Sequence, residues 1–279
     1  MMEWWHAVVL GIVEGITEFL PVSSTGHVTV VQKLLGYTID SPDMTAFAAI
    51  IQIGSILAAV LYFWKDITRI VAAWWKGLFD KKARTSQDYR MGWMVIVGSL
   101  PIAIVGLAFH TQIETTLRSL WVVAIALLVW SGVMWIADAT AKQVKDESKA
   151  TWKDTLLIGV VQCLALIPGV SRSGATISVG LLRGFDRVAA TKLAFFLGIP
   201  ALLAAGMYQA ASQFNAVADG AGWAATIIGT ITAFIVSYIV VSWLLRFIAH
   251  HSYMTFIWYR IGFGVLLIAF LSIGIIPAV

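Results

Sequence analysis

The sequence is poor in cysteine and in charged residues. Cys163 is the only cysteine among 279 residues, so the chain cannot form an intramolecular disulfide. Charged residues make up 12% of the chain and apolar residues 59%, a balance that excludes an ordinary soluble domain. The N-terminal stretch MMEWWHAVV has an acid and no basic cluster, so we expect no cleaved signal peptide. These scarcities indicate an integral membrane protein.

Long apolar runs are what the sequence has in abundance. A helix needs roughly 17 to 25 apolar residues to cross a hydrocarbon core about 30 Å thick. Six runs reach that length, and they lack the two-residue alternation of barrel strands. We therefore predict an all-α polytopic membrane protein, one integral membrane domain over residues 1–279, with spans near residues 44–64, 93–110, 120–137, 193–210, 223–244 and 255–278.

Lysine and arginine gather in two of the segments between these runs. Residues 65–90 hold seven basic residues and residues 138–154 hold four, so both segments should face the cytoplasm. Residues 37–45 and 211–222 hold none and should face outside. The net charge of +4 is explained by this orientation and by attraction to anionic membrane lipids. We expect no nucleic-acid partner.

Two segments, residues 4–36 and 155–187, do not have the pattern of a plain span. Each has an apolar arm, a centre rich in Pro, Gly, Ser and Thr, and a second apolar arm. A helix that breaks at membrane depth must be buried in protein or line a wet cavity, because lipid offers no partners for the freed backbone groups. We predict two re-entrant helical hairpins, the first entering from outside and the second from inside.

These two hairpins are related by an internal repeat. Residues 11–26 and 159–174 align with an offset of 148, and five of the sixteen positions are identical. The repeats cover about residues 1–137 and 155–279, joined by a cytoplasmic linker at about residues 138–154. Each half has one hairpin and three spans, an odd number, so the halves should have inverted topology. In such folds the broken helices meet near the midplane, where their tips form the site.

Two acids lie in the first arm of the first hairpin. Glu14 and Glu18 are four residues apart, so both carboxylates project from one helix face. The pair could lie at the lipid interface without a functional role, but ionisable groups at membrane depth usually mark a functional cavity. The pair could bind a divalent metal through oxygen, transfer protons, or pair with a basic residue of the second hairpin.

The tip of the first hairpin carries hydroxyls and a histidine. Ser23, Ser24 and Thr25 precede Gly26 and His27. At least one hydroxyl should cap the second arm, and the free N–H groups of a helix start also favour a phosphate. His27 is either a structural histidine or, beside Ser24, a proton carrier or base.

The tip of the second hairpin carries one arginine among small polar residues. Arg172 occupies the position aligned with Ser24 in the repeat. It could extend to the membrane surface, but Ser171, Ser173 and Thr176 around it favour an anion-binding nest. A guanidinium in such a nest can hold a phosphate through two hydrogen bonds.

Three stretches of the chain resemble a known family. EGITEFLPVSSTGH at residues 14–27, FAAIIQIGSILAAV at residues 47–60 and PGVSRSGAT at residues 168–176 closely resemble the bacterial undecaprenyl-diphosphate phosphatase family, also called the bacitracin-resistance family. The resemblance covers essentially the whole chain. It implies hydrolysis of undecaprenyl diphosphate to undecaprenyl phosphate and inorganic phosphate, which recycles the lipid carrier of peptidoglycan synthesis. It also implies a multi-pass protein of the bacterial plasma membrane whose site is reached from the outer face.

The resemblance assigns roles to individual residues. It implies a catalytic set of Glu14, Glu18, Ser24, His27 and Arg172. A divalent cation, Mg²⁺ or Ca²⁺, is implied as the cofactor, with Glu14 and Glu18 as candidate ligands. The substrate phosphates would then be bound by Ser23, Thr25, Gly26, Ser171, Arg172, Ser173 and Thr176.

Our mechanistic hypothesis has Ser24 attacking the terminal phosphorus while Arg172 and the N–H groups of the tips hold the phosphoryl oxygens. His27 and a metal-bound water are the alternative nucleophiles. A transporter or flippase of phosphorylated isoprenoid lipid is the alternative function, because inverted repeats with broken helices are common in transporters. The sequence leaves open whether the protein forms a homodimer.

Overall fold

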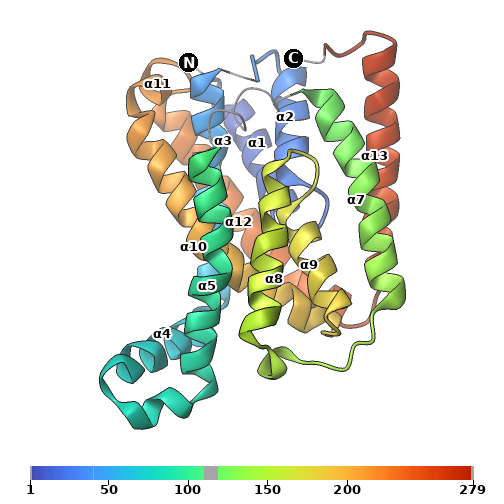
Figure 1. Ribbon diagram of the computed structural model, residues 1–279. Helices are drawn as coiled ribbons and strands as arrows, with labels where there is room; N and C mark the ends of the chain where they lie inside the picture. Colours follow the sequence, from blue (N-terminus) through green and yellow to red (C-terminus); the bar gives the residue numbers. More distant parts are fainter. Residues whose placement is uncertain (1, 40, 110–118, 278–279) are drawn as a thin grey trace.

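A computed structural model describes residues 2–39, 41–109 and 119–277 of the chain. Within these residues the secondary structure is helical, with one isolated bridge between Lys145 and Phe185 and no strand. Figure 1 shows the helices arranged side by side as a bundle. The all-α prediction is confirmed for the part of the chain that the structure describes.

Among the described residues, six helices are long and apolar enough to cross a membrane, as predicted. Several of their side chains, among them Ile104, Ile125 and Ile239, are more than half exposed. A soluble protein would not expose so much apolar surface, so this surface faces lipid. The predicted span ends at residues 110 and 278 lie outside the described residues. The six helices are α3 (Pro42–Tyr62), α5 (Gln87–Ala108), α7 (Leu120–Thr140), α10 (Arg187–Ser212), α12 (Trp223–Ile248) and α13 (Met254–Ser272).

Four shorter helices form two pairs where the sequence predicts broken helices. α1 (Trp4–Thr17) and α2 (Ser24–Leu34) make the first pair. α8 (Trp152–Gln162) and α9 (Arg172–Leu182) make the second, with the short 3₁₀ helix η3 (Cys163–Leu166) between them. In Figure 1 the first pair joins the rest of the bundle at the end that carries the N-terminus, and the second pair joins it at the opposite end.

The segment between the first two spans contains a helix that the sequence analysis does not predict. α4 (Trp64–Phe79) is amphipathic, with Trp75 and Phe79 exposed among basic residues. The 3₁₀ helix η1 (Lys81–Thr85) follows it. Because the basic residues of α4 are interleaved with apolar ones, counting charges alone hides the helical period.

The two basic segments lie at the same end of the bundle. Figure 1 shows α4 and the linker before α8 at one end, and the N-terminus and α11 (Phe214–Asp219) at the other. The linker contains the 3₁₀ helix η2 (Glu147–Lys149), and Glu147 pairs with Lys192 of α10 at 2.8 Å. Both segments that should face the cytoplasm are therefore on one side, as the charge pattern predicts.

Glycines allow the first arm of each pair to approach a long helix closely. Gly11 of α1 packs against the carbonyl of Gly229 in α12, and Gly159 of α8 packs against that of Gly98 in α5. In both places an added Cβ would overlap with that carbonyl oxygen, so a larger residue does not fit. Gly11 and Gly159 are 148 residues apart, so they are aligned positions of the two pairs. The two contacts hold the first arm of each pair close to a long helix.

Candidate active site

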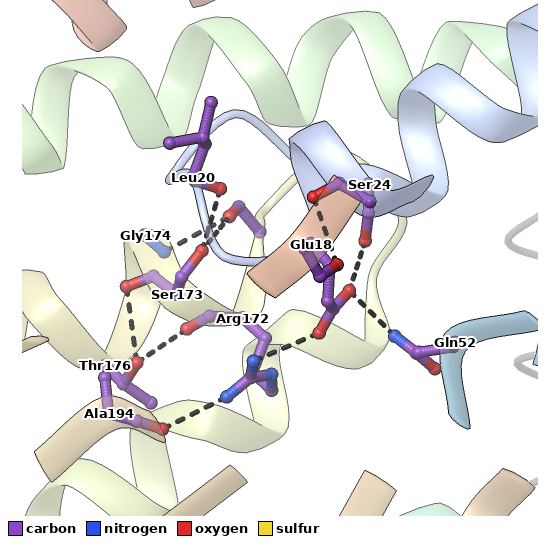
Figure 2. A network of polar contacts seen from close by, with 12 residues as sticks. Glu18, Leu20, Ser24, Gln52, Arg172, Ser173, Gly174, Thr176 and Ala194 are labelled. Carbon is purple, nitrogen blue, oxygen red and sulfur yellow. Dashed lines mark hydrogen bonds and ion pairs between the residues drawn. The ribbon is translucent and has the colours of Figure 1, made fainter. Parts of the chain in front are cut away.

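Glu18 is the centre of a buried polar network between the two helix pairs. It is the C-cap residue of α1 and is only 4% exposed. Its Oε1 atom pairs with Arg172 Nη2 at 3.0 Å. Its Oε2 atom accepts hydrogen bonds from Ser24 Oγ at 2.7 Å and from Gln52 Nε2 at 2.9 Å (Figure 2). One carboxylate therefore connects the nucleophile candidate of the first turn to the cation of the second.

The two turns have the same local geometry. Ser23 is the N-cap of α2 and accepts a hydrogen bond from Gly26 N, and Ser171 is the N-cap of α9 and accepts one from Gly174 N. Their φ angles are +78° and +73°, a region that residues other than glycine rarely adopt. Such strain is maintained only where the surroundings hold it, and it is common at functional sites. Ser24 and Arg172 follow directly as the first residues of their helices.

The guanidinium of Arg172 is held from two further sides. Nη1 donates to Ala194 O of α10 at 3.1 Å. The group lies against Gly198 of the same helix, where an added Cβ would overlap with Nη1. The Nε atom is buried and has no hydrogen-bond partner among the described residues. Arg172 thus keeps its Nε–H for a further acceptor, as an anion-binding residue should.

A cavity of about 250 Å³ opens beside this network. Its polar lining consists of the carboxylate, hydroxyl, amide and guanidinium groups just described, together with Thr25 and Thr29 of α2. The rest of the wall is apolar. It includes Ile102, Val123, Ala165, Leu166, Pro168, Leu202 and Ala205. The cavity therefore offers contacts both to a polar head group and to an apolar chain.

The predicted phosphate-binding residues divide into two groups. Ser23, Thr25, Ser171 and Arg172 line the cavity. The others support the backbone of the turns. Ser173 Oγ donates to Leu20 O at 2.9 Å and thereby ties the second turn to the first (Figure 2). Thr176 Oγ1 donates to the carbonyl of Arg172 at 2.8 Å. Gly26 N completes the cap of α2 by donating to Ser23 Oγ.

His27 does not lie where the sequence analysis expects a base. Its Nδ1 atom contacts Ser23 O at 2.8 Å and its Nε2 atom contacts Tyr259 OH at 2.7 Å. The ring stacks on Phe263 of α13 with a centroid separation of 4.2 Å. The imidazole is held by two aromatic residues of α13, Tyr259 and Phe263, and the Ser24 hydroxyl donates to Glu18. The proton acceptor in contact with Ser24 is therefore the carboxylate of Glu18.

Glu14 lies one turn before Glu18 on α1 and is 3% exposed. Its Oε1 atom has no hydrogen-bond partner among the described residues. No group of three or more His, Cys, Asp or Glu side chains with metal-binding geometry occurs in residues 2–39, 41–109 and 119–277. The two predicted metal ligands are both buried, but of the two only Glu14 has an oxygen atom without a hydrogen-bond partner among the described residues.

Three residues that contribute to the site are absent from the predicted set. Gln52 fixes one oxygen of Glu18, Gly198 makes room for the guanidinium, and Thr29 lines the cavity. Gln52 is recognisable in the sequence as an amide inside an apolar span that could satisfy a neighbouring hairpin, and its bond to Glu18 does so. Gly198 and Thr29 have no comparable signal, because both residue types are common in membrane helices.

The fold and the site together define a polytopic membrane protein with a buried site of carboxylate, hydroxyl and guanidinium groups. The sequence profile of the bacitracin resistance protein BacA matches residues 7–266, and the chain belongs to this family. It is 58% identical to undecaprenyl-diphosphatase 3 of Frankia casuarinae, over 99% of this chain and the whole of that protein. It is 53% identical to the undecaprenyl-diphosphatase of Cutibacterium acnes, over 99% of this chain and 100% of that protein.

Proposed function

We infer that this protein is an undecaprenyl-diphosphatase, which hydrolyses undecaprenyl diphosphate to undecaprenyl phosphate and inorganic phosphate and so confers resistance to bacitracin. Full-length relatives with that name support this function, and so does membership of the family. The single structural observation that carries it is the carboxylate of Glu18, in contact with both Ser24 and Arg172. Diphosphate hydrolysis needs a nucleophile, a proton acceptor and a cation close together, and this network supplies all three.

We propose that Ser24 is the nucleophile. Its Oγ attacks the terminal phosphorus, and its proton passes to Glu18 Oε2, to which it already donates at 2.7 Å. The bond between that phosphorus and the bridging oxygen breaks, and undecaprenyl phosphate leaves with the proton from Glu18, which becomes a carboxylate again. Water then hydrolyses the phosphoserine and releases inorganic phosphate, with Glu18 as the base.

Arg172 binds the phosphoryl oxygens in this proposal. Its unpartnered Nε and the N–H groups at the starts of α2 and α9 point to a site for an anion. Charge that builds on the phosphoryl group is stabilised by the guanidinium, which Glu18 and Ala194 hold in place. The apolar wall of the cavity receives the first part of the isoprenoid chain, and the remainder lies in the membrane.

A divalent cation, Mg²⁺ or Ca²⁺, is compatible with these residues. Both ions prefer oxygen ligands, and Mg²⁺ is often held by one or two carboxylates plus substrate phosphates. Glu14 has a buried carboxylate oxygen without a partner, whereas both oxygens of Glu18 are engaged. Glu14, assisted by Glu18, would hold the cation, which neutralises charge on the diphosphate when bound.

We propose an inverted repeat with two re-entrant hairpins as the finer architecture. The repeats are residues 1–137 and 155–279, with residues 138–154 as a cytoplasmic linker. The matching strained caps at Ser23 and Ser171 support this division, since they are 148 residues apart and start helices of equal length. We place the protein in the bacterial plasma membrane with its N-terminus outside and the cavity open to the outer side.

Phosphate release by the purified protein in detergent tests this function. Undecaprenyl diphosphate should yield inorganic phosphate without a sealed membrane. A transporter or flippase of the same lipid needs two compartments and would release none in detergent. Absence of release in detergent, together with lipid movement in vesicles, would show that transport is the function.

A further inference from the structure

Arg260 of α13 is a buried cation outside the site described above. It is 0% exposed and has the largest side chain among the fully buried residues. No carboxylate lies within ion-pair distance of it in the part of the chain that the structure describes. Burying an unpaired charge is costly unless hydrogen bonds replace the lost hydration. Its hydrogen bonds should therefore reveal what it does.

The guanidinium of Arg260 donates to backbone carbonyls of both turns. Nη1 donates to Pro21 O at 3.1 Å, and Nη2 donates to Gly169 O at 2.9 Å and to Val170 O at 3.2 Å. Pro21 and Gly169 are 148 residues apart, so they are equivalent positions of the two turns. One side chain thus holds the same backbone position in each turn.

Two further contacts fasten the guanidinium to α7. Nε donates to Ser131 Oγ at 3.1 Å and Nη2 lies 3.3 Å from Leu127 O. Both acceptors lie inside one long helix, which gives the side chain a rigid support. The contacts with α7 therefore anchor Arg260, and those with Pro21, Gly169 and Val170 join the turns.

The carbonyls that Arg260 holds lie directly before the reacting groups. Pro21 and Gly169 each stand two residues before a strained cap, Ser23 or Ser171. The next residue after each cap is Ser24 or Arg172. A shift of either turn would therefore change the separation between the hydroxyl and the guanidinium of the site. A displacement of 1 Å in such a pair can lower a rate on the order of 100-fold.

We propose that Arg260 is a positioning residue that clamps the two turns together and sets the separation of Ser24 from Arg172. This inference rests on the proposed function of the site. Arg260 does not line the cavity, and its hydrogen bonds go to none of Ser24, Glu18 and Arg172. An arginine suits this role because its planar group presents five N–H donors in a fixed fork. Lysine has a single ammonium that cannot reach carbonyls on both sides in the same geometry.

The experiment uses the full-length protein in detergent. Arg260→Lys and Arg260→Gln are compared with Ser131→Ala, which removes one contact with α7 but leaves the contacts with Leu127 O and with the turns. Arg246→Lys is the control for the substitution itself, because Arg246 is exposed and its side chain bonds, within the described part of the chain, to Ser242 of its own helix alone. Two quantities are measured: kcat and KM for phosphate release from undecaprenyl diphosphate, and hydrogen exchange of the amides in residues 19–26 and 167–175.

If Arg260 positions the two turns, kcat should fall on the order of 100-fold in both Arg260 variants, and KM should change less than about threefold. Hydrogen exchange should also be faster at both turns. Ser131→Ala and Arg246→Lys should stay within about twofold of the wild-type kcat. A residue that merely stabilised the bundle would not separate kcat from KM, nor confine the faster exchange to the two turns.

Three results would each contradict this positioning role. The first is a wild-type kcat in Arg260→Lys, and the second is faster hydrogen exchange at one turn only. The third is loss of the folded protein in both Arg260 variants, because that would show that Arg260 stabilises the whole bundle. If the wild-type protein released no phosphate, the proposed function would fail. The exchange measurement would still decide whether Arg260 joins the turns.

Discussion

Ser24 and Arg172 contact the two oxygens of a single carboxylate. Ser24 Oγ donates to one oxygen of Glu18 and the Arg172 guanidinium pairs with the other. These two residues occupy equivalent positions of turns that are 148 residues apart in the sequence. One turn thus carries a hydroxyl and the other carries a cation at the aligned position, and the fold brings them within the width of one carboxylate. Neither turn holds the whole set of reacting groups.

Replacing Glu18 with glutamine should abolish most of the activity. Glutamine has nearly the same shape, but it cannot accept the Ser24 proton and leaves Arg172 without a counter-charge. We expect phosphate release to fall on the order of 10²- to 10⁴-fold, measured as kcat in detergent. Glu3→Gln is the matched control, because Glu3 is exposed near the start of α1. Equal activity in the two variants would refute the role of Glu18 as proton acceptor.

Replacing Gly198 with alanine should displace the Arg172 guanidinium. The added methyl group overlaps with Nη1, so the side chain must leave its position between Glu18 and Ala194. We expect a higher KM and a lower kcat for undecaprenyl diphosphate, with a thermal unfolding midpoint close to that of the wild type.

Gly262→Ala is the control for this substitution. Gly262 lies in α13 with open space around its Cα, so an added methyl group meets nothing. Alanine is also the better helix former by about 1 kcal/mol. The control should therefore keep wild-type kinetics, and a Gly198→Ala protein with the same kinetics would contradict the proposed contact.

Removal of divalent cations should lower phosphate release, and Mg²⁺ should restore it. Glu14 has the carboxylate oxygen available for such an ion. In Glu14→Gln we expect the Mg²⁺ concentration for half-maximal activity to rise about tenfold, since loss of one metal-binding group commonly lowers metal affinity by that factor or more. The measurement is a Mg²⁺ titration after chelation. Identical titration curves for the variant and the wild type would exclude Glu14 as a ligand.

Asp154 should stabilise the fold in a manner that depends on pH. Its carboxylate is fully buried and pairs with Arg183 at 2.6 Å and with Lys145 at 3.7 Å. Burial opposes its ionisation, but hydrogen bonds from Thr151 and Arg183 outweigh that effect and hold the pKa of Asp154 below its ordinary value. A lowered pKa means that this stabilisation is present above about pH 4 and is lost as the pH falls through the folded-state pKa.

Asp154→Asn tests this expectation. At pH 7 the variant should unfold at a lower temperature. The loss in free energy of unfolding should be smaller than the roughly 3 to 5 kcal/mol lost when a fully buried ion pair is broken, because Arg183 is partly exposed. The difference from the wild type should stay constant from about pH 7 to 5 and shrink toward pH 3. Asp80→Asn, at an exposed cap, should show little change at any pH, and a difference for Asp154→Asn that does not shrink would contradict the assignment.

Much of the site could be predicted from the sequence. Glu14 and Glu18 stand out because acids are rare in apolar helices, and Arg172 stands out for the same reason. The repeat then predicts that the two turns meet, since inverted halves place equivalent segments face to face. The network at Glu18 confirms this meeting of the turns.

The orientation of His27 could not be predicted. Its partners Tyr259 and Phe263 come from α13, more than 230 residues further along the chain, and no local pattern indicates that contact. The role of Arg260 was hidden for a related reason. Its acceptors are backbone carbonyls, which every residue has and which therefore leave no mark in a sequence. The helix α4 was missed because its charged residues are interleaved with apolar ones along the sequence, and the two kinds separate only on the helical period.

The most direct test of the account is phosphate release from undecaprenyl diphosphate by the Ser24→Ala protein in detergent. Ser212→Ala, at the exposed end of α10, controls for the substitution. We predict that Ser24→Ala keeps at most about 1% of the wild-type kcat while remaining folded, because the attacking oxygen is gone. Near-normal release by Ser24→Ala would contradict the account and would assign the attack to another nucleophile, such as His27 or water.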